Sequence, residues 1–353
     1  MTPFTTYFMG NTPSSSMGQT GNTVSGSCAS NPNKKSSGKR KAVLISAMYY
    51  GQRSRLCGTL NGAAAMYGLL LDHLNYKEEN MVILNETSKY PHCQPTKENI
   101  VKAMHWLVQD AQPGDTLFFF FGGHGYSVDD LDGDEPGCFD SVICPVDFEN
   151  PRTKAFDNML SDDDIHRYMV KPLKPGVRLT AVFDSCHSGS VMDLPYNYDT
   201  SGKQNHSGVF QFVAKYLARA LASYAKGSVD LKGIKNGAWL IKKRLTANRK
   251  AEQKSEATKS SQADVVQWSA CRDDDTGYVA PFCKPYCYMG VMSHAFVKSF
   301  SENPQQSYVQ FLHSVRDICA TEGPKQVPKP VDHLQVPQLS CSHPLDTDLP
   351  VIM

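Results

Sequence analysis

A cysteine and a histidine in this chain each follow a short apolar run, and together they could do nucleophilic chemistry. Cys186 lies in AVFDSCHSGS, residues Ala181 to Ser190, and His124 lies in LFFFFGGHGYS, residues Leu117 to Ser127. A thiol is a weak nucleophile until an imidazole takes its proton, and the same imidazole can return the proton to a leaving amine. Polar and small neighbours distinguish Cys186 from a buried filler cysteine. The sequence therefore predicts Cys186 as a nucleophile and His124 as its base.

Backbone groups beside this pair could stabilise the charge that develops during attack on a carbonyl. Glycines at positions 122, 123 and 125 flank His124 and would let a substrate backbone approach closely. We expect the N–H groups of Gly125 and Cys186 to form an oxyanion hole, because such donors act on charge present only in the tetrahedral intermediate. His187 is an adjacent alternative base, but neighbouring side chains generally point apart, which favours His124.

Aspartates are concentrated near these motifs. They occur in an acidic run that ends at Asp140, in the triplet Asp162 to Asp164, and at Asp193, seven residues after Cys186. The triplet after Ser161 would make an ordinary helix start. Clusters of carboxylates beside an active site also suit a hard cation such as Ca²⁺.

The elements that must position these residues alternate along the chain. Short apolar runs and amphipathic stretches follow one another from Ala42, as in strands joined by crossover helices. The continuously apolar run Leu117 to Phe121 predicts a strand covered on both faces, and hence an α/β fold with a mostly parallel central sheet. Ligands of such sheets bind beyond the carboxyl ends of the strands, where His124 and Cys186 are expected. The predicted strands are 42–48, 81–84, 116–121, 178–184, 263–270 and 336–340, and the predicted helices are 58–74, 97–109, 162–170, 208–224 and 305–320.

Composition limits the classes of protein to consider. The chain has 353 residues, 41% of them hydrophobic, which is enough for a substantial core. A formal net charge of +1 gives no reason to expect nucleic acid or an anionic membrane as a partner. Eleven cysteines cannot all pair, and no apolar leader opens the chain, so we expect a reducing, cytoplasmic setting without membrane insertion.

Two segments differ from the rest in composition. Residues 1 to 40 are rich in Ser, Thr, Gly and Asn and predict a disordered arm. The arm ends in the basic cluster Lys34 to Lys41, which is typical of a solvated linker or, alternatively, of a nuclear-import signal. A loop insertion at about 199–262 carries ten Lys or Arg against three acids between Lys226 and Lys259, a charge run that predicts an exposed loop. We therefore expect one domain, residues 41–353, interrupted by this basic loop.

Taken together, the motifs resemble those of the type I metacaspases, most closely the fungal kind. The resemblance runs from about Lys41 onward and rests on the ordered segments GGHGYSVDDLDGDEPG, CPVDF, SDDDIH, RLTAVFDSCHSGS, DLPY, ADVV, MSHAF, PQQSY and VPQLS. Metacaspases are caspase-like cysteine peptidases with a Cys/His dyad, a preference for Arg or Lys at P1, calcium activation and frequent self-processing. The resemblance therefore implies a caspase-like fold, a calcium cofactor, protein substrates with a basic P1 residue, and a monomeric enzyme whose dyad is His124 and Cys186.

The resemblance also implies roles for single residues. Asp184 is similar to the acid of the basic-specific S1 pocket, and Gly122 occupies a position beside the substrate. The implied calcium ligands are Asp140, Asp162, Asp163 and Asp193. The implied self-cleavage candidates in the basic loop are Lys242, Lys243, Arg244, Arg249 and Lys250.

Some positions depart from the family pattern. The family usually has Ser-Gly-His-Gly where this chain has Gly122 to Gly125, and an aspartate where this chain has Gly62. A carboxylate opposite a guanidinium makes a charge-assisted contact, so its loss would weaken selectivity for basic residues. The alternative function is a catalytically weak caspase-fold scaffold or aggregate-binding protein. The presence of both dyad residues favours the enzyme.

Overall fold

The computed structural model describes residues 38–129, 139–149, 157–186, 189, 191–204, 254–271, 279–283, 287–326 and 335–353. The predicted arm before residue 38, the predicted helix at 208–224 and the five self-cleavage candidates lie outside these residues. Residues 205–253 of the predicted basic loop also lie outside them. The other predicted helices and strands can be compared with the structure.

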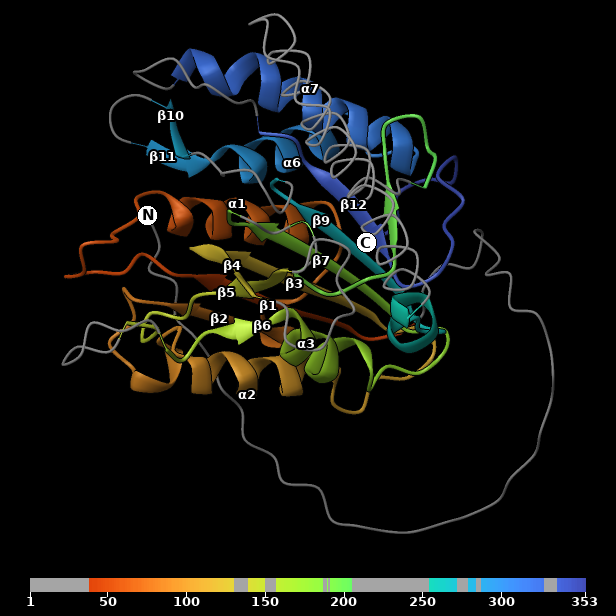
Figure 1. Ribbon diagram of the computed structural model, residues 1–353. Helices are drawn as coiled ribbons and strands as arrows, with labels where there is room; N and C mark the ends of the chain where they lie inside the picture. The colour runs from red at the N-terminus through yellow and green to blue at the C-terminus, as the bar shows by residue number, and fades with distance from the viewer. Residues whose placement is uncertain are drawn as a thin grey trace, which may run out of the picture.

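Within the described residues, seven strands form the central sheet, in the order β2-β1-β3-β7-β9-β12-β8 (Figure 1). The first five in this order are parallel to one another, which confirms the predicted mostly parallel sheet. β12 (Gln338–Cys341) is antiparallel to β9, and β8 (Tyr196–Tyr198) is antiparallel to β12. The parallel strands are β1 (Arg40–Ser46), β2 (Met81–Asn85), β3 (Thr116–Gly122), β7 (Arg178–Asp184) and β9 (Asp264–Ser269).

Helices cover both faces of this sheet (Figure 1). α1 (Thr59–Asp72), α6 (Val291–Glu302) and α7 (Tyr308–Gln326) lie on one face, and α2 (Lys97–Val108) lies on the other. Side chains of β3 alternate between the two cores: Phe118 and Phe120 pack in the first, Phe119 and Phe121 in the second. All four side chains are fully buried, and the burial of each stabilises the fold by roughly 1.5–3 kcal/mol. Burial on both faces is the reason that this run is continuously apolar.

The predicted helix at 162–170 is divided in the structure. α3 (Asp162–Ile165) continues as a π-helical turn, His166–Val170. The hydroxyl of Ser161 accepts a hydrogen bond from the N–H of Asp164 at 3.2 Å, as expected of an N-cap. α7 begins three residues later than predicted and ends six residues later.

α6 was not predicted as a helix. It begins after Gly290, which supplies no side-chain cap, so the usual start signal is missing from the sequence. The cap comes instead from β7, where the Asp184 carboxylate accepts the N–H of Ser293 at 3.0 Å. A contact between residues 109 positions apart leaves no local pattern.

Two small sheets were also not predicted. β4 (Gly125–Asp129), β5 (Phe139–Ile143) and β6 (Leu160–Ser161) form an antiparallel sheet that leaves the main sheet directly after His124. β10 (Val279–Cys283) and β11 (Cys287–Gly290) form a hairpin. Short 3₁₀ turns span Glu78–Asn80 and Pro91–Cys93.

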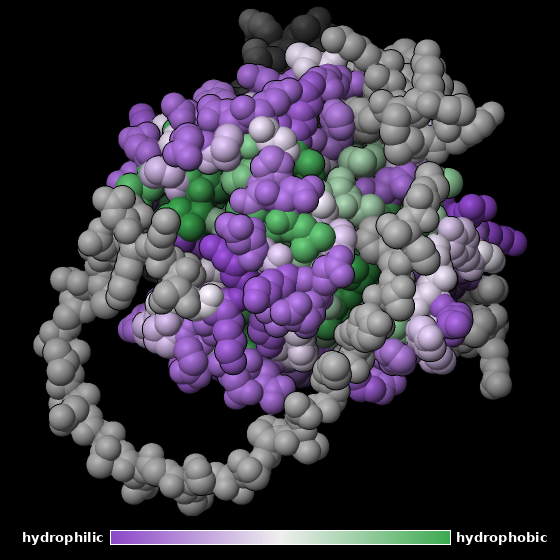
Figure 2. Space-filling model, turned by 180° about the vertical axis from the view of Figure 1, so that it is seen from behind, coloured by the Kyte–Doolittle hydropathy of each residue, from purple (hydrophilic) through white to green (hydrophobic). Residues whose placement is uncertain are grey.

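The surface opposite to the view of Figure 1 is mostly hydrophilic, with smaller hydrophobic patches between the polar side chains (Figure 2). Among the described residues, no helix has the length and apolar character needed to cross a bilayer.

Candidate active site

The register of the sheet places His124 and Cys186 at neighbouring strand ends. β3 and β7 are parallel with Gly122 opposite Asp184, and the N–H of Gly123 donates to the carbonyl of Asp184 at 3.4 Å. His124 and Cys186 each lie two residues beyond that last pair. Because adjacent strands are about 4.8 Å apart, the two residues start from neighbouring points on the carboxyl edge.

The imidazole of His124 is held by groups from the segment between β1 and α1. Its Nε2 lies 2.6 Å from the backbone carbonyl oxygen of Ser54, which can only accept, so Nε2 carries the proton and Nδ1 is left as the acceptor. The ring of Tyr49 packs against it with centroids 4.6 Å apart, and the ring of Tyr126 stacks at 6.1 Å. Two aromatic rings and one carbonyl therefore fix the orientation and the tautomer of His124.

Burial lowers the pKa of His124 below its ordinary value of 6.5, and the hydrogen bond to Ser54 only partly opposes this. The imidazole is therefore neutral at physiological pH. A neutral imidazole with a free Nδ1 lone pair is the form that can accept a proton from a thiol.

Tyr49 also contacts the backbone of His124. Its hydroxyl accepts the N–H of His124 at 2.7 Å and donates to the carbonyl of Cys144 at 2.7 Å. Tyr49 is fully buried, in a small core with Cys144 and Phe148. This phenol joins the ends of β3 and β5 beneath the imidazole.

Gly125 lies directly against the backbone of Cys186. A Cβ at Gly125 would lie 2.2 Å from the carbonyl oxygen of Cys186, so only glycine fits. At this end of the β4–β5 ladder the N–H of Cys144 donates to the carbonyl of His124, which makes Gly125 and Ile143 a non-hydrogen-bonded pair. The N–H of Gly125 is thus not donated to β5, as an oxyanion donor requires.

Cys186 is half-buried and follows the buried Ser185. The carbonyl of Ser185 accepts the thiol of Cys271 at 3.4 Å, which ties the turn after β7 to the end of β9. A partly accessible thiol on a turn fixed from both sides suits a nucleophile better than a core filler.

The Asp184 carboxylate faces α6 rather than open solvent. It accepts the N–H and the hydroxyl of Ser293, and the Cα of Gly290 approaches so closely that a Cβ would overlap Oδ2. Burial raises the pKa of Asp184, while the two hydrogen bonds from Ser293 oppose the rise. Gly62 borders the same group, since a Cβ there would lie 2.8 Å from the Ser293 hydroxyl. Asp184 therefore caps α6 and lies opposite Gly122 in the sheet.

Among the predicted calcium ligands, Asp162 accepts backbone N–H groups, whereas Asp163 and Asp193 contact a lysine ammonium. Asp162 is 2% exposed, and its carboxylate accepts the N–H groups of Ser141 and Asp163 at 2.6 and 2.9 Å. Burial raises the pKa of Asp162 to about 8, and the charges of Asp193 and Asp140 act in the same direction. Asp162 and Asp163 are consecutive on α3, and the N–H of Ser141 on β5 brings the residue after Asp140 to Asp162.

Lys259 places a cation in this acidic cluster. Its ammonium contacts the carboxylates of Asp163 and Asp193, and its backbone carbonyl accepts Nε2 of His166 at 3.0 Å. The residue is 9% exposed, so the predicted exposed loop from Lys226 to Lys259 is wrong at its last position. Within the described part of the chain, no three His, Cys, Asp or Glu side chains converge as the ligands of one metal ion.

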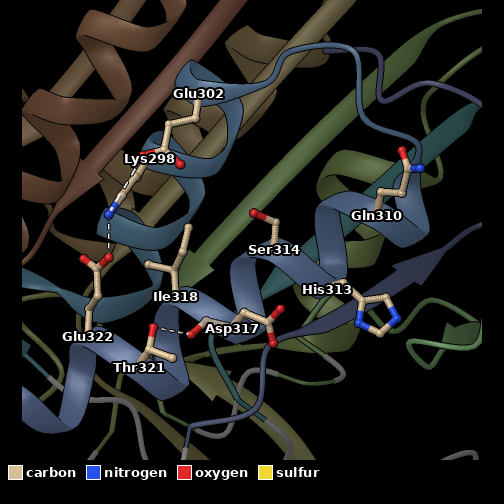
Figure 3. A pocket seen from close by; sticks show the side chains of 9 residues that line it. All are labelled: Lys298, Glu302, Gln310, His313, Ser314, Asp317, Ile318, Thr321 and Glu322. Atoms are coloured by element: carbon tan, nitrogen blue, oxygen red, sulfur yellow. Dashed lines mark hydrogen bonds and ion pairs between the residues drawn. The ribbon is translucent and has the colours of Figure 1, made fainter.

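A separate hollow of about 620 Å³ lies between α6 and α7 (Figure 3). Lys298 bridges the carboxylates of Glu322 and Glu302 on its wall. The hollow contains no cysteine and none of the predicted site residues, so it is not the candidate active site. It is lined by Lys298, Glu302, Gln310, His313, Ser314, Asp317, Ile318, Thr321 and Glu322.

Four contributors to this region were missed by sequence reasoning. Ser54 acts through its backbone carbonyl, and no residue type signals such a role. Tyr49 directly follows the predicted strand 42–48, where an aromatic residue predicts only a place in the core. Ser293 and Lys259 act on carboxylates that are distant in sequence, and Lys259 lies in a charge run that otherwise predicts solvent.

Comparison with known proteins identifies the family of this chain. Residues 40–195 match the family described as metacaspase, peptidase C14 domain. Metacaspase-1B of Neurospora crassa is 45% identical over 316 residues, which cover 90% of this chain and 70% of the relative. Metacaspase-1 of Ajellomyces capsulatus is also 45% identical, over 90% of this chain and 83% of the relative.

Solved structures are more distant from this chain. Caspase-1 of Spodoptera frugiperda aligns with a TM-score of 0.42 and 11% identity, over 88% of each chain. A protein of Geobacter sulfurreducens aligns with a TM-score of 0.46 and 16% identity, over 86% of this chain and 93% of the other.

Proposed function

Since the chain belongs to the fungal type I metacaspases, a family of caspase-like cysteine peptidases, we propose that it is a calcium-activated endopeptidase that cleaves after Arg or Lys and processes itself. The observation that carries the proposal is the β3–β7 register, which starts His124 and Cys186 from neighbouring points at the carboxyl edge of the sheet.

The proposed reaction uses the groups at this edge. Nδ1 of His124 takes the proton of the Cys186 thiol, and the thiolate attacks the carbonyl carbon of the substrate. The N–H groups of Gly125 and Cys186 donate to the oxyanion. His124 then gives its proton to the amine nitrogen, and the C–N bond of the tetrahedral intermediate breaks. The amine leaves, and the acyl group stays on Cys186 as a thioester. Water, deprotonated by His124, hydrolyses the thioester and restores the thiol.

Asp184 is the proposed recognition group for a basic P1 side chain. It is a carboxylate two residues before the nucleophile, opposite Gly122, and it already accepts two hydrogen bonds from Ser293. Further lone pairs remain for a guanidinium or ammonium. A single, partly satisfied carboxylate supports a preference for Arg or Lys that is weaker than two acids would give.

The donor chemistry of the acidic cluster fits calcium. Carboxylate oxygens, as on Asp140, Asp162, Asp163 and Asp193, are of the type that Ca²⁺ prefers, and two of these groups, Asp163 and Asp193, already contact the Lys259 ammonium. The described carboxylates do not converge as the ligands of one ion, so the proposal is supported by their donor type and charge. When bound, Ca²⁺ would supply positive charge that offsets the repulsion between these carboxylates. Asp193, which follows Cys186 by seven residues, would thereby be held beside Asp162 and Asp163.

Further parts of the proposal concern the whole protein. Self-processing would occur in the basic loop at one of the five Lys or Arg candidates. We also propose a monomer that works in the cytoplasm, with nuclear import through Lys34 to Lys41 as the alternative, and without nucleic acid or membrane as partners.

The test is a fluorogenic peptide assay with Arg, Lys or Asp at P1, with and without millimolar Ca²⁺. We expect turnover of the Arg and Lys peptides only with Ca²⁺, and its loss in Cys186→Ala and His124→Gln. Cys57→Ala is the matched control, because Cys57 is an exposed free cysteine outside the site. Turnover that survives Cys186→Ala would contradict the dyad, and equal negligible rates in all conditions would favour the scaffold alternative.

A further inference from the structure

The carboxylate of Glu86 binds three successive backbone N–H groups of the segment that supports His124. Glu86 directly follows β2, the strand next to β1. Its Oε2 accepts the N–H groups of Met48 and Tyr49, the latter at 2.7 Å, and its Oε1 accepts that of Tyr50 at 2.8 Å. Successive N–H groups that converge on an anion form a nest, here filled by a side chain of the same protein.

This contact holds a backbone conformation that a tyrosine does not adopt by itself. Tyr49 has a φ of 55°, in the left-handed region, where a side chain is disfavoured. Such conformations persist when the surroundings over-determine them. The Glu86 carboxylate fixes the N–H side of Tyr49, and the hydrogen bonds to His124 and Cys144 fix its hydroxyl.

From these contacts we infer that Glu86 is a positioning residue for the catalytic histidine and acts through Tyr49. The carboxylate sets the backbone of residues 48–50, this backbone sets the phenol, and the phenol sets both the main chain and one face of the imidazole of His124. In this series of contacts Glu86 acts on His124 through Tyr49 and not directly. The inference deepens the proposed function, because it assumes that His124 is the base for Cys186.

A glutamine at this position can replace only part of the contact. Its amide oxygen can accept N–H groups, but its amide nitrogen donates and opposes the remaining N–H. Glu86→Gln therefore loosens residues 48–50 while it keeps the size of the side chain. Tyr49→Phe removes the next step instead, since it keeps the ring but loses both hydrogen bonds of the hydroxyl.

The primary experiment measures alkylation of Cys186 by iodoacetamide at pH 6.5 and pH 9.5, followed by mass spectrometry of the Cys186 peptide. A thiol with a well-placed imidazole keeps reactivity at pH 6.5, whereas an isolated thiol with a pKa of about 8.5 loses it. The ratio of the two rates cancels changes in accessibility, so a purely structural destabilisation does not move it. Glu79→Gln is the matched control, because Glu79 is a 73% exposed side chain before β2 that pairs only loosely with Lys77.

We expect Glu86→Gln and Tyr49→Phe to lower this ratio about tenfold, as for a base displaced by a fraction of an ångström. In the peptide assay kcat should fall by the same factor, with KM within about twofold of the wild-type value. An unchanged ratio in a folded Glu86→Gln protein would overturn the inference, and so would a higher ratio, since loss of a nearby negative charge by itself favours the thiolate. A wild-type ratio no greater than that of Cys57 would instead mean that the dyad itself is wrong.

Discussion

At the scale of single residues, the site depends most on positions where a side chain is absent. Gly125 leaves no space beside the Cys186 carbonyl, where a Cβ would overlap the oxygen at 2.2 Å. The neighbour is backbone, which cannot rotate away as a side chain could. We therefore expect Gly125→Ala to displace the turn that carries Cys186 and to lower kcat/KM at least about a hundredfold.

A glycine-to-alanine substitution inside a helix, away from the site, should stabilise the protein and leave its activity unchanged. Gly68 lies inside α1, and a Cβ there would meet only one carboxylate oxygen at 4.0 Å. Gly68→Ala should raise the free energy of unfolding by about 0.5–1 kcal/mol without loss of turnover. Urea denaturation and the peptide assay on both variants test these two predictions. A fully active Gly125→Ala protein would refute the close contact between Gly125 and the Cys186 carbonyl.

The residue types in the sequence predict part of the proposed site, and the structure adds residues that the sequence did not predict. Cys186 and His124 could be predicted because a thiol and an imidazole have few other uses on glycine-rich strand ends. Ser54 and Glu86 could not, because one acts through its carbonyl and the other through backbone N–H groups distant in sequence. A contact made to the main chain leaves no requirement on the residue type of its partner.

At the scale of elements, the predicted strands were those whose own sequence requires burial. β3 is apolar throughout because both of its faces are covered. β8 and β6 were missed because they are three and two residues long, and the partner of β8 lies far along the chain. α6 was missed because its cap belongs to β7. Short elements fixed by tertiary contacts carry too little local pattern to predict.

The ion pair between the first residues of β7 and β9, together with a nearby histidine, makes the stability of the fold depend on pH. Arg178 and Asp264 are register partners, joined at 2.6 Å, and His343 lies 3.6 Å from the same carboxylate. The contact with Asp264 raises the pKa of His343 above its ordinary value of 6.5. A raised histidine pKa stabilises the fold fully below about pH 6.5 and loses this contribution as pH rises through the folded value.

We therefore expect His343→Gln to be less stable than the wild type at pH 5.5 and nearly equal to it at pH 9. The difference should be no more than about 1 kcal/mol, because His343 is partly exposed. Chemical denaturation at the two pH values measures it. His73→Gln, at the exposed end of α1, should show no such difference, and a gap that widens toward pH 9 would contradict the sign.

The helical segment 254–259 contacts Asp163 of α3 and Asp193 through the Lys259 ammonium. The contacting side chains are 11% exposed for Lys259 and 6% exposed for Asp193, whereas that of Asp163 is 47% exposed, so removal of the ammonium takes a cation away from one buried carboxylate and one partly exposed carboxylate. We expect Lys259→Met to destabilise the calcium-free protein by about 3 kcal/mol. The same carboxylates should then favour Ca²⁺, so the rise in Tm on adding Ca²⁺ should be larger than in the wild type.

This comparison is made in a Cys186→Ala background, so that self-cleavage does not intervene. Lys254→Met is the matched control, since it removes the same charge from the same helical segment at a less buried position. An equal calcium-induced rise in Tm for the wild type and Lys259→Met would show that Lys259 and Ca²⁺ do not compete.

At the scale of the whole molecule, the order of the sheet determines what a cut in the basic loop does. β7 and β8 precede residues 205–253, whereas β9 and β12 follow them. In space the order is β7-β9-β12-β8, so the two strands of the later part lie between two strands of the earlier part. A break between residues 242 and 250 therefore cuts none of the strands that the structure describes.

We therefore expect the two halves to stay together after cleavage. A specific protease site inserted between residues 242 and 250 of Cys186→Ala should give two bands on a denaturing gel and one species, at the position of the intact protein, in native size-exclusion chromatography. The fragments should separate only when denaturant unfolds the sheet, because separation exposes both edges of the β9–β12 pair. An uncut protein with the same insertion is the control. Separation of the fragments in native buffer would contradict the interleaved strand order.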